Sequence, residues 1–82
     1  MSVFRIVLES VEDEMNTLRT KMDDNHKKRQ ELSIAIDKTN DRSKREQIKN
    51  QIDSLKDEYK SMKDQMNNLK EKQYQVKKQN QN

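Results

Sequence analysis

The sequence contains no glycine, proline, cysteine or tryptophan, and it has few apolar residues for its 82-residue length. Without glycine and proline the chain lacks the usual formers of tight turns, so sheets built from β-hairpins are disfavoured. Without cysteine it can form no disulfide, thiolate metal site or thiol nucleophile. Apolar residues make up only 28% of the chain, whereas a compact domain draws nearly half of its residues from that set. A conventional globular core is therefore excluded.

The chain also lacks a long hydrophobic run. Its most apolar segment, residues 3–8, is interrupted by Arg5 and is far shorter than the roughly 20 residues of a membrane span. Acidic residues begin at Glu9 with no small-residue cleavage site before them, so we expect neither a signal peptide nor a transit peptide. The net charge of +3 is small for a chain that is 40% charged, and it implies no strongly anionic partner. We expect an intracellular protein, in the cytoplasm or on the cytoskeleton.

The apolar residues that are present recur at the a and d positions of two heptad registers. The two stripes hold 17 of the 23 apolar residues, and a stripe this narrow is typical of a coiled coil. High charge with low hydrophobicity is also the signature of disorder, but disorder does not explain the placement. We call the following residues the seam and predict that they form the interaction surface between helices: Phe4, Leu8, Val11, Met15, Leu18, Met22, Leu32, Ile36, Ile48, Ile52, Leu55, Tyr59, Met62, Met66, Leu69 and Val76.

The two registers are out of phase by two residues, and residues 37–47, where they meet, contain no apolar side chain. Ser43 and Glu46 have the spacing of a capping box, which marks the start of a helix. Asn40 tolerates the left-handed conformation that often ends one. The sequence therefore predicts an all-α fold, a two-helix antiparallel coiled-coil hairpin. A single long helix in a parallel coiled-coil dimer is the alternative. The predicted unit spans residues 1–82, with a helix at 3–38, a turn at 39–43, a helix at 44–78 and a frayed tail at 79–82.

The predicted hairpin aligns residues whose numbers sum to 84. Two polar residues interrupt the first half of the seam. Asn25 falls opposite Tyr59, whose hydroxyl could pair with the amide, and Arg29 falls opposite Leu55. A polar residue in a helix–helix core lowers stability but can restrict the permitted registers. We therefore predict that Asn25 and Arg29 set the register. The apolar layers of this alignment include Met15 with Leu69, Leu18 with Met66, and Met22 with Met62.

The charges of the two halves differ in sign. Residues 1–41 carry a net charge of −2, and residues 42–82 carry +5. This asymmetry favours one half lying on the other, although exposed ion pairs contribute only about 0–1 kcal/mol each. The hairpin brings together three pairs of opposite charge: Glu12 with Lys70, Glu14 with Lys72, and Lys28 with Glu58.

The N-terminal segment is apolar on several faces of a helix. Exposed, it would be a docking site, an anchor inserted into a partner subunit. Two other interpretations are a helix end that widens its own seam, and a strand followed by a helix capped only from Ser10. The predicted N-terminal docking patch comprises Val3, Phe4, Ile6, Val7 and Leu8.

No residue pattern indicates catalysis. His26 is the only histidine, and a metal site would need further ligands at fixed spacing. Acidic runs read as a solvated helix surface, and a two-stripe helix pair offers no shielded pocket that would shift a pKa for acid–base chemistry. We expect no enzyme activity, no catalytic or metal-binding residues, no cofactor and no small-molecule substrate.

The function predicted from these features is that of a structural coiled-coil subunit. It would mediate protein–protein assembly as a scaffold, spacer or staple, with other protein subunits or further copies of itself as partners. One alternative is a parallel homodimeric oligomerisation rod. Another is a basic helical module that binds nucleic acid or an acidic filament surface through its lysines; interleaved acidic residues and scarce aromatics disfavour nucleic acid.

Overall fold

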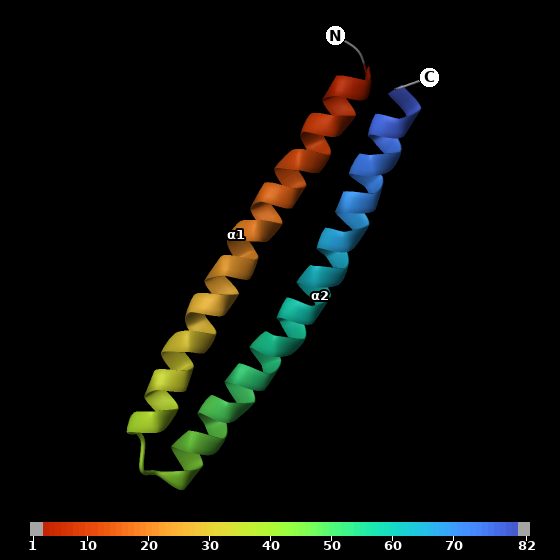
Figure 1. Cartoon of the computed structure of the whole chain (residues 1–82). Coiled ribbons are helices and arrows are strands. Elements are labelled where there is room, and N and C mark those ends of the chain that lie inside the picture. Colours follow the sequence, from red (N-terminus) through yellow and green to blue (C-terminus); the bar gives the residue numbers. More distant parts are fainter. Residues whose placement is uncertain (1–2, 81–82) are drawn as a thin grey trace.

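The chain folds as a hairpin of two long antiparallel helices (Figure 1). The computed structural model describes residues 3–80, and side chains to residue 79. Helix α1 spans Val3–Lys38 and helix α2 spans Arg42–Asn80, and no strand occurs among the described residues. The molecule is 62 Å long and only 17 by 12 Å across. The all-α helical hairpin is confirmed, and the single continuous helix is wrong.

Two of the predicted element ends differ from the structure. Helix α2 begins at Arg42, inside the predicted turn, because the chain needs only residues 39–41 to reverse. Residues 79 and 80 of the predicted frayed tail are helical, and its last two residues, 81–82, lie outside the described part of the chain.

Thr39 caps the C-terminal end of helix α1. The Thr39 hydroxyl donates to the carbonyl oxygen of Ala35 at 2.8 Å, and the Thr39 amide N–H donates to the carbonyl oxygen of Ile36 at 3.4 Å. These bonds satisfy carbonyls that have no partner further along the helix. No described residue has a positive φ, so Asn40 does not adopt the left-handed conformation that it tolerates.

Helix α2 starts on an aspartate cap. Asp41 Oδ1 accepts hydrogen bonds from the amide N–H groups of Ser43 at 2.9 Å and Lys44 at 3.3 Å, and its backbone carbonyl accepts from the Arg45 N–H at 2.9 Å. The predicted capping box at Ser43 and Glu46 is therefore wrong. Asp41 takes that role because the turn is short and its carboxylate also suits the positive end of the helix dipole.

Replacing Asp41 by alanine is expected to lower the free energy of unfolding by about 0.5–2 kcal/mol, because two amide N–H groups lose their acceptor. Ser43→Ala is the matched control, since Ser43 contributes only its backbone to the cap, and it should change stability little. Urea denaturation followed by circular dichroism measures both. A larger loss for Ser43→Ala than for Asp41→Ala would contradict this assignment of the cap.

The tightest packing lies in the half of the hairpin that is distant from the turn. Val11, Met15, Leu18 and Met66 are buried, and Met22, Met62 and Leu69 pack against them. This cluster contains both members of the three predicted layers Met15–Leu69, Leu18–Met66 and Met22–Met62, in keeping with the alignment that sums to 84.

Candidate interaction surfaces

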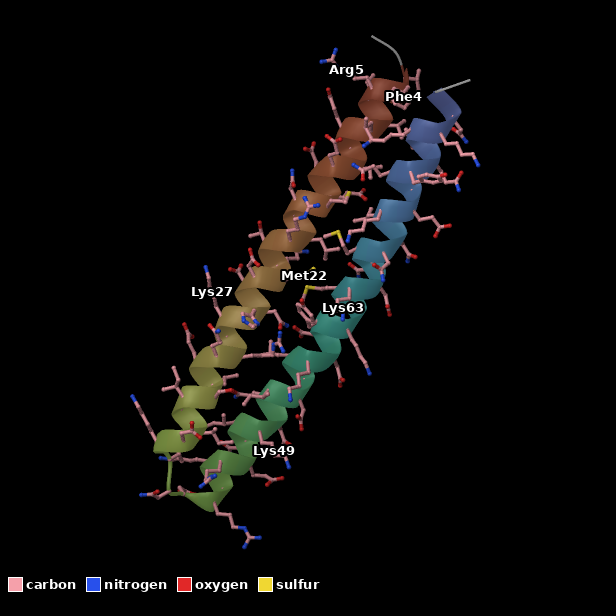
Figure 2. All side chains as sticks on the ribbon, viewed as in Figure 1. Phe4, Arg5, Met22, Lys27, Lys49 and Lys63 are labelled. Atoms are coloured by element: carbon pink, nitrogen blue, oxygen red, sulfur yellow. The ribbon has the colours of Figure 1, made fainter. Side chains whose placement is uncertain are left out.

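The seam is only partly covered by the hairpin itself. Figure 2 shows the seam residues Phe4 and Met22 between the two helices. Of the 16 predicted seam residues, Val11, Met15, Leu18 and Met66 are buried and the other 12 are half-buried. Two helices cannot enclose a shared apolar stripe on both flanks, because each flank opens to solvent where the helix surfaces curve away from each other. Apolar surface therefore remains open along the molecule.

Both polar atoms of the Asn25 side chain are hydrogen-bonded. Asn25 is 3% exposed; its Nδ2 donates to the backbone carbonyl oxygen of Leu55 at 2.8 Å, and its Oδ1 accepts from Arg29 Nε at 2.9 Å. The predicted bond to the Tyr59 hydroxyl is not formed, because the short amide reaches the backbone of the preceding turn of α2. Asn25 thus joins the two helices by a specific bond.

Arg29 completes this layer by contacting the aromatic ring of Tyr59. Its guanidinium carbon lies 4.8 Å from the centroid of the Tyr59 ring, a cation–π geometry. The same side chain donates to Asn25 (see above), so Asn25, Arg29 and Tyr59 form one connected group. The register-setting role of Asn25 and Arg29 stays a prediction.

None of the three predicted charge pairs between the helices forms an ion pair. An ion pair does occur within α1, between Arg5 Nε and Glu9 Oε1 at 3.3 Å, and both side chains are exposed. Exposed lysine ammonium groups gain little from such pairs and remain hydrated. Charge between the predicted partners therefore does not hold this hairpin together.

The N-terminal patch is helical from Val3, so the strand interpretation is wrong. Val3 and Ile6 are exposed and the other three residues of the patch are half-buried. Val3, Phe4 and Val7 line a shallow groove together with Val76 of α2. The patch both widens the seam and leaves apolar side chains outside it.

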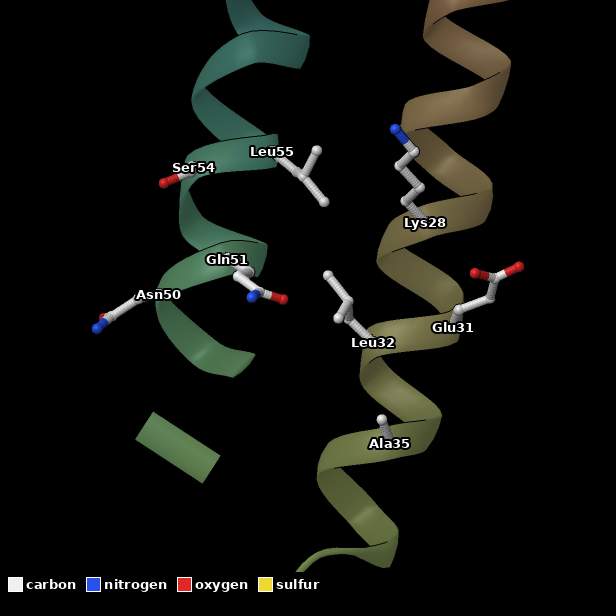
Figure 3. Close-up of a pocket in the computed structure, with 8 residues that line it drawn as sticks. All are labelled: Lys28, Glu31, Leu32, Ala35, Asn50, Gln51, Ser54 and Leu55. Atoms are coloured by element: carbon white, nitrogen blue, oxygen red, sulfur yellow. The ribbon is translucent and has the colours of Figure 1, made fainter. Parts of the chain in front are cut away.

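One side of the hairpin carries an apolar groove near the turn. Leu32, Ala35 and Leu55 form its apolar surface, and Leu32 and Leu55 point toward one another (Figure 3). Polar side chains border it: Lys28 and Glu31 from α1, and Asn50, Gln51 and Ser54 from α2.

A second groove lies on the same side, further from the turn. Leu18 and Leu69 contribute to it, with a border that is more strongly charged. The bordering residues are Ser10, Asp13, Glu14, Thr17, Lys21, Gln65 and Asn68. We call the side with these two grooves the groove face. Leu18, Leu32, Leu55 and Leu69 of these grooves belong to the predicted seam, but the bordering residues were not predicted to form a surface, although most of them occupy the c and g heptad positions next to the seam.

The α2 edge of the groove face is almost free of charge. Between residues 47 and 68, the c and g heptad positions hold a single charged residue, Glu58. We call the opposite edge of α2 the lysine face. It lies on the side of the hairpin where Lys56 borders another groove, together with Arg29, Ile34 and Ile52. The uncharged edge comprises Gln47, Gln51, Ser54, Ser61, Gln65 and Asn68, and the lysine face comprises Lys49, Lys56, Lys60, Lys63 and Lys70.

His26 lies on the exposed surface of α1 within hydrogen-bond range of two neighbours. Its Nδ1 is 3.5 Å from Arg29 Nη2, and its Nε2 is 3.3 Å from Gln30 Nε2. Across residues 3–80, no group of three or more histidine, cysteine, aspartate or glutamate side chains is arranged to hold a metal ion. No helix in this range combines the length and apolar character needed to cross a membrane.

Comparison of the chain with protein-family models, curated proteins and solved structures finds no match. Function is therefore inferred from the surfaces described above.

Proposed function

We propose that this protein is a structural subunit that mediates protein–protein assembly as a scaffold, spacer or staple. One observation carries the proposal: 12 of the 16 seam residues remain half-buried, so the hairpin leaves apolar surface open along its length. A two-helix unit buries too little to be strongly stable alone. Further helices packed along the open flanks, in coiled-coil fashion, would cover this surface and stabilise the fold.

The shape supports the same role. A hairpin 62 Å long sets a fixed distance between contacts made at its turn and contacts made at the opposite end, which we call the open end. The exposed Val3 and Ile6 offer an apolar contact at the open end, and we propose that this patch docks on another subunit. The proposal places this assembly in the cytoplasm or on the cytoskeleton, and it assigns no catalytic step to the chain.

A charge placed in the N-terminal patch is expected to release the protein from its assembly. Ile6→Glu is the test variant and Ile34→Glu the matched control, because both isoleucines lie on α1 and are 54% and 55% exposed. Tagged variants are expressed in the source cells, cross-linked, and analysed by size-exclusion chromatography and mass spectrometry. We expect the unmodified chain and Ile34→Glu to elute with other subunits, and Ile6→Glu to elute without them.

If the unmodified chain elutes free of every other protein, the assembly role is wrong. Equal retention of both variants would instead remove the N-terminal patch as the contact. Circular dichroism of each variant shows whether the helices are intact.

The lysine face favours a second candidate, a module that binds an acidic surface. Lysines recur along it from Lys49 to Lys70, but acidic residues such as Asp53, Asp57 and Asp64 are interspersed on the same helix. Contacts to phosphates or carboxylates weaken steeply as salt rises, whereas apolar packing does not. An assembly that dissociates when salt is raised from about 50 to 200 mM would favour this candidate over the structural subunit.

A further inference from the structure

We propose that the groove face binds a second copy of this chain, with both turns at the same end, to form a two-fold symmetric four-helix bundle. The inference rests on the proposed function and deepens it by naming one surface and its occupant. Helical hairpins that associate face to face are an established route to four-helix bundles, and a two-fold dimer uses the same surface on both copies.

Charge is distributed unevenly on α2. Its groove-face edge holds one charged residue, Glu58, between positions 47 and 68, while the opposite edge carries a row of lysines. Interface cores are depleted of charged residues relative to the remaining surface. All of the uncharged edge residues are exposed in the single hairpin, so no packing within the chain explains the absence of charge. A partner that excludes water from this edge does.

The hairpin exposes more surface than a compact monomer of its mass. The hairpin exposes 6706 Å², whereas a compact monomer of its 9.9 kDa mass exposes about 5,200 Å² by the usual scaling. The excess is roughly 1,500 Å², and a standard interface buries about 800 Å² on each partner. An interface of that size would remove about half of the excess, so the hairpin has enough surplus surface for a stable dimer.

The two grooves differ in charge, and this difference sets the orientation of the second copy. With both turns at one end, the groove formed by Leu32, Ala35 and Leu55 meets the same groove of the second copy, so apolar surface lies on apolar surface. With the turns at opposite ends, it would instead meet the groove bordered by Asp13 and Glu14. Apolar side chains gain most when the opposing surface is also apolar.

Charge complementarity favours the same orientation. A two-fold axis along the hairpin places α1 of one copy against α2 of the other, at the heights set by the alignment that sums to 84. Glu14 then lies near Lys72 of the second copy, and Lys28 lies near Glu58 of the second copy. These residues form no ion pair within one hairpin, and an interface between two copies gives each a partner of opposite charge.

The proposed dimer leaves other surfaces open. The lysine face lies on the side opposite the groove face, and Ile6 belongs to the outer surface of α1 at the open end. Both remain available to further subunits, so the dimer is the unit that enters the larger assembly.

Sedimentation equilibrium of the purified full chain tests the interface. The unmodified protein should sediment as a dimer, and Ser54→Glu should weaken dimerisation more than about tenfold, because it places a carboxylate against Glu31 of the second copy in a desolvated contact. Ser33→Glu is the matched control: the same exposed residue type and the same new charge, on the opposite side of the hairpin. It should leave the dissociation constant unchanged. Circular dichroism shows whether each variant keeps its helices.

A monomer at all concentrations overturns the proposal, and so does a dimer that Ser33→Glu disrupts while Ser54→Glu does not. Neither result bears on the proposed function, which is tested separately by whether the chain elutes with other subunits from cell extracts. Conversely, if the protein is a dimer but binds no other subunit in cell extracts, the groove-face interface is supported and the proposed larger assembly is wrong.

A single cysteine at Asn40 tests the orientation, because the chain has no cysteine of its own and Asn40 is exposed in the turn. Spin labels on the two copies should lie within about 30 Å of each other when the turns share one end, since packed helices are 8–10 Å apart. Turns at opposite ends would separate them by about 55 Å, the length of a helix of this size at 1.5 Å per residue. The longer distance alone would overturn the proposed orientation.

Discussion

Truncation of Leu18 to alanine is expected to unfold much of the isolated hairpin. Leu18 is 6% exposed and lies in the small buried cluster with Val11, Met15 and Met66. A buried Leu→Ala change costs about 2–5 kcal/mol, with the larger values where the cavity cannot collapse. Because a two-helix unit has little stability to lose, this single change removes most of it. Urea denaturation followed by circular dichroism gives the loss in free energy of unfolding.

The matched control is Leu32→Ala, which alters the same residue type at the same heptad position of the same helix. Leu32 is half-buried and borders the open groove near the turn, so its loss should be no more than about 1.5 kcal/mol, in proportion to the smaller apolar area involved. Equal losses for the two variants in dilute solution would contradict the uneven burial of the seam. If two copies associate through the groove face, the loss for Leu32→Ala should grow with protein concentration.

The hairpin could be predicted because its signal is repeated many times. Seventeen apolar residues follow one of two heptad registers, and the change from one register to the other falls in a single polar segment. The site of reversal therefore follows from the pattern. The cap of α2 could not be predicted in this way. Asp41 and Ser43 are both good capping residues only two positions apart, and the choice between them depends on how tightly residues 39–41 turn.

Burial along the seam shows a second limit of the sequence. Leu18 and Leu32 are equivalent by heptad position, yet one is buried and the other half-buried. The difference arises from neighbours on both helices. Leu18 lies in a cluster with long methionine side chains, whereas Leu32 is flanked by the small Ala35 and by Gln51. Periodicity identifies which side chains face the partner helix, but not how well the neighbouring volume is filled.

The polar layer shows the same limit at the level of one side chain. The heptad pattern predicted that Asn25 lies at a core position opposite Tyr59, and Asn25 is buried. Its bond partner is the backbone of Leu55, because the length and rotamer of the amide decide which acceptor it reaches. The groove face was missed for a different reason: an absence of charge at c and g positions becomes informative only when the grooves beside it are known.

Replacing Asn25 by leucine is expected to raise the free energy of unfolding, whereas Asn25→Ala should lower it by about 1–3 kcal/mol. Leucine fills the buried volume and extends the apolar seam. The carbonyl oxygen of Leu55 keeps the hydrogen bond that it makes within its own helix, and Arg29 keeps its contact with the Tyr59 ring. Both variants lose the two bonds of the amide, but alanine also leaves a cavity. Thermal and urea unfolding of the two variants measure the opposite signs.

The greater stability of Asn25→Leu should come with a loss of specificity, because a polar residue in a helix–helix core disfavours alternative pairings. Cysteines replacing Met22 and Met62, which pack against the same cluster, report the pairing in a chain that has no other cysteine. At high dilution the Asn25 chain should form this disulfide within one molecule. The Asn25→Leu chain should form a larger fraction between molecules, as pairings without the Asn25–Leu55 bond become competitive. An unchanged intramolecular yield would show that Asn25 stabilises no particular register, and only intermolecular disulfides in the Asn25 chain would contradict the hairpin itself.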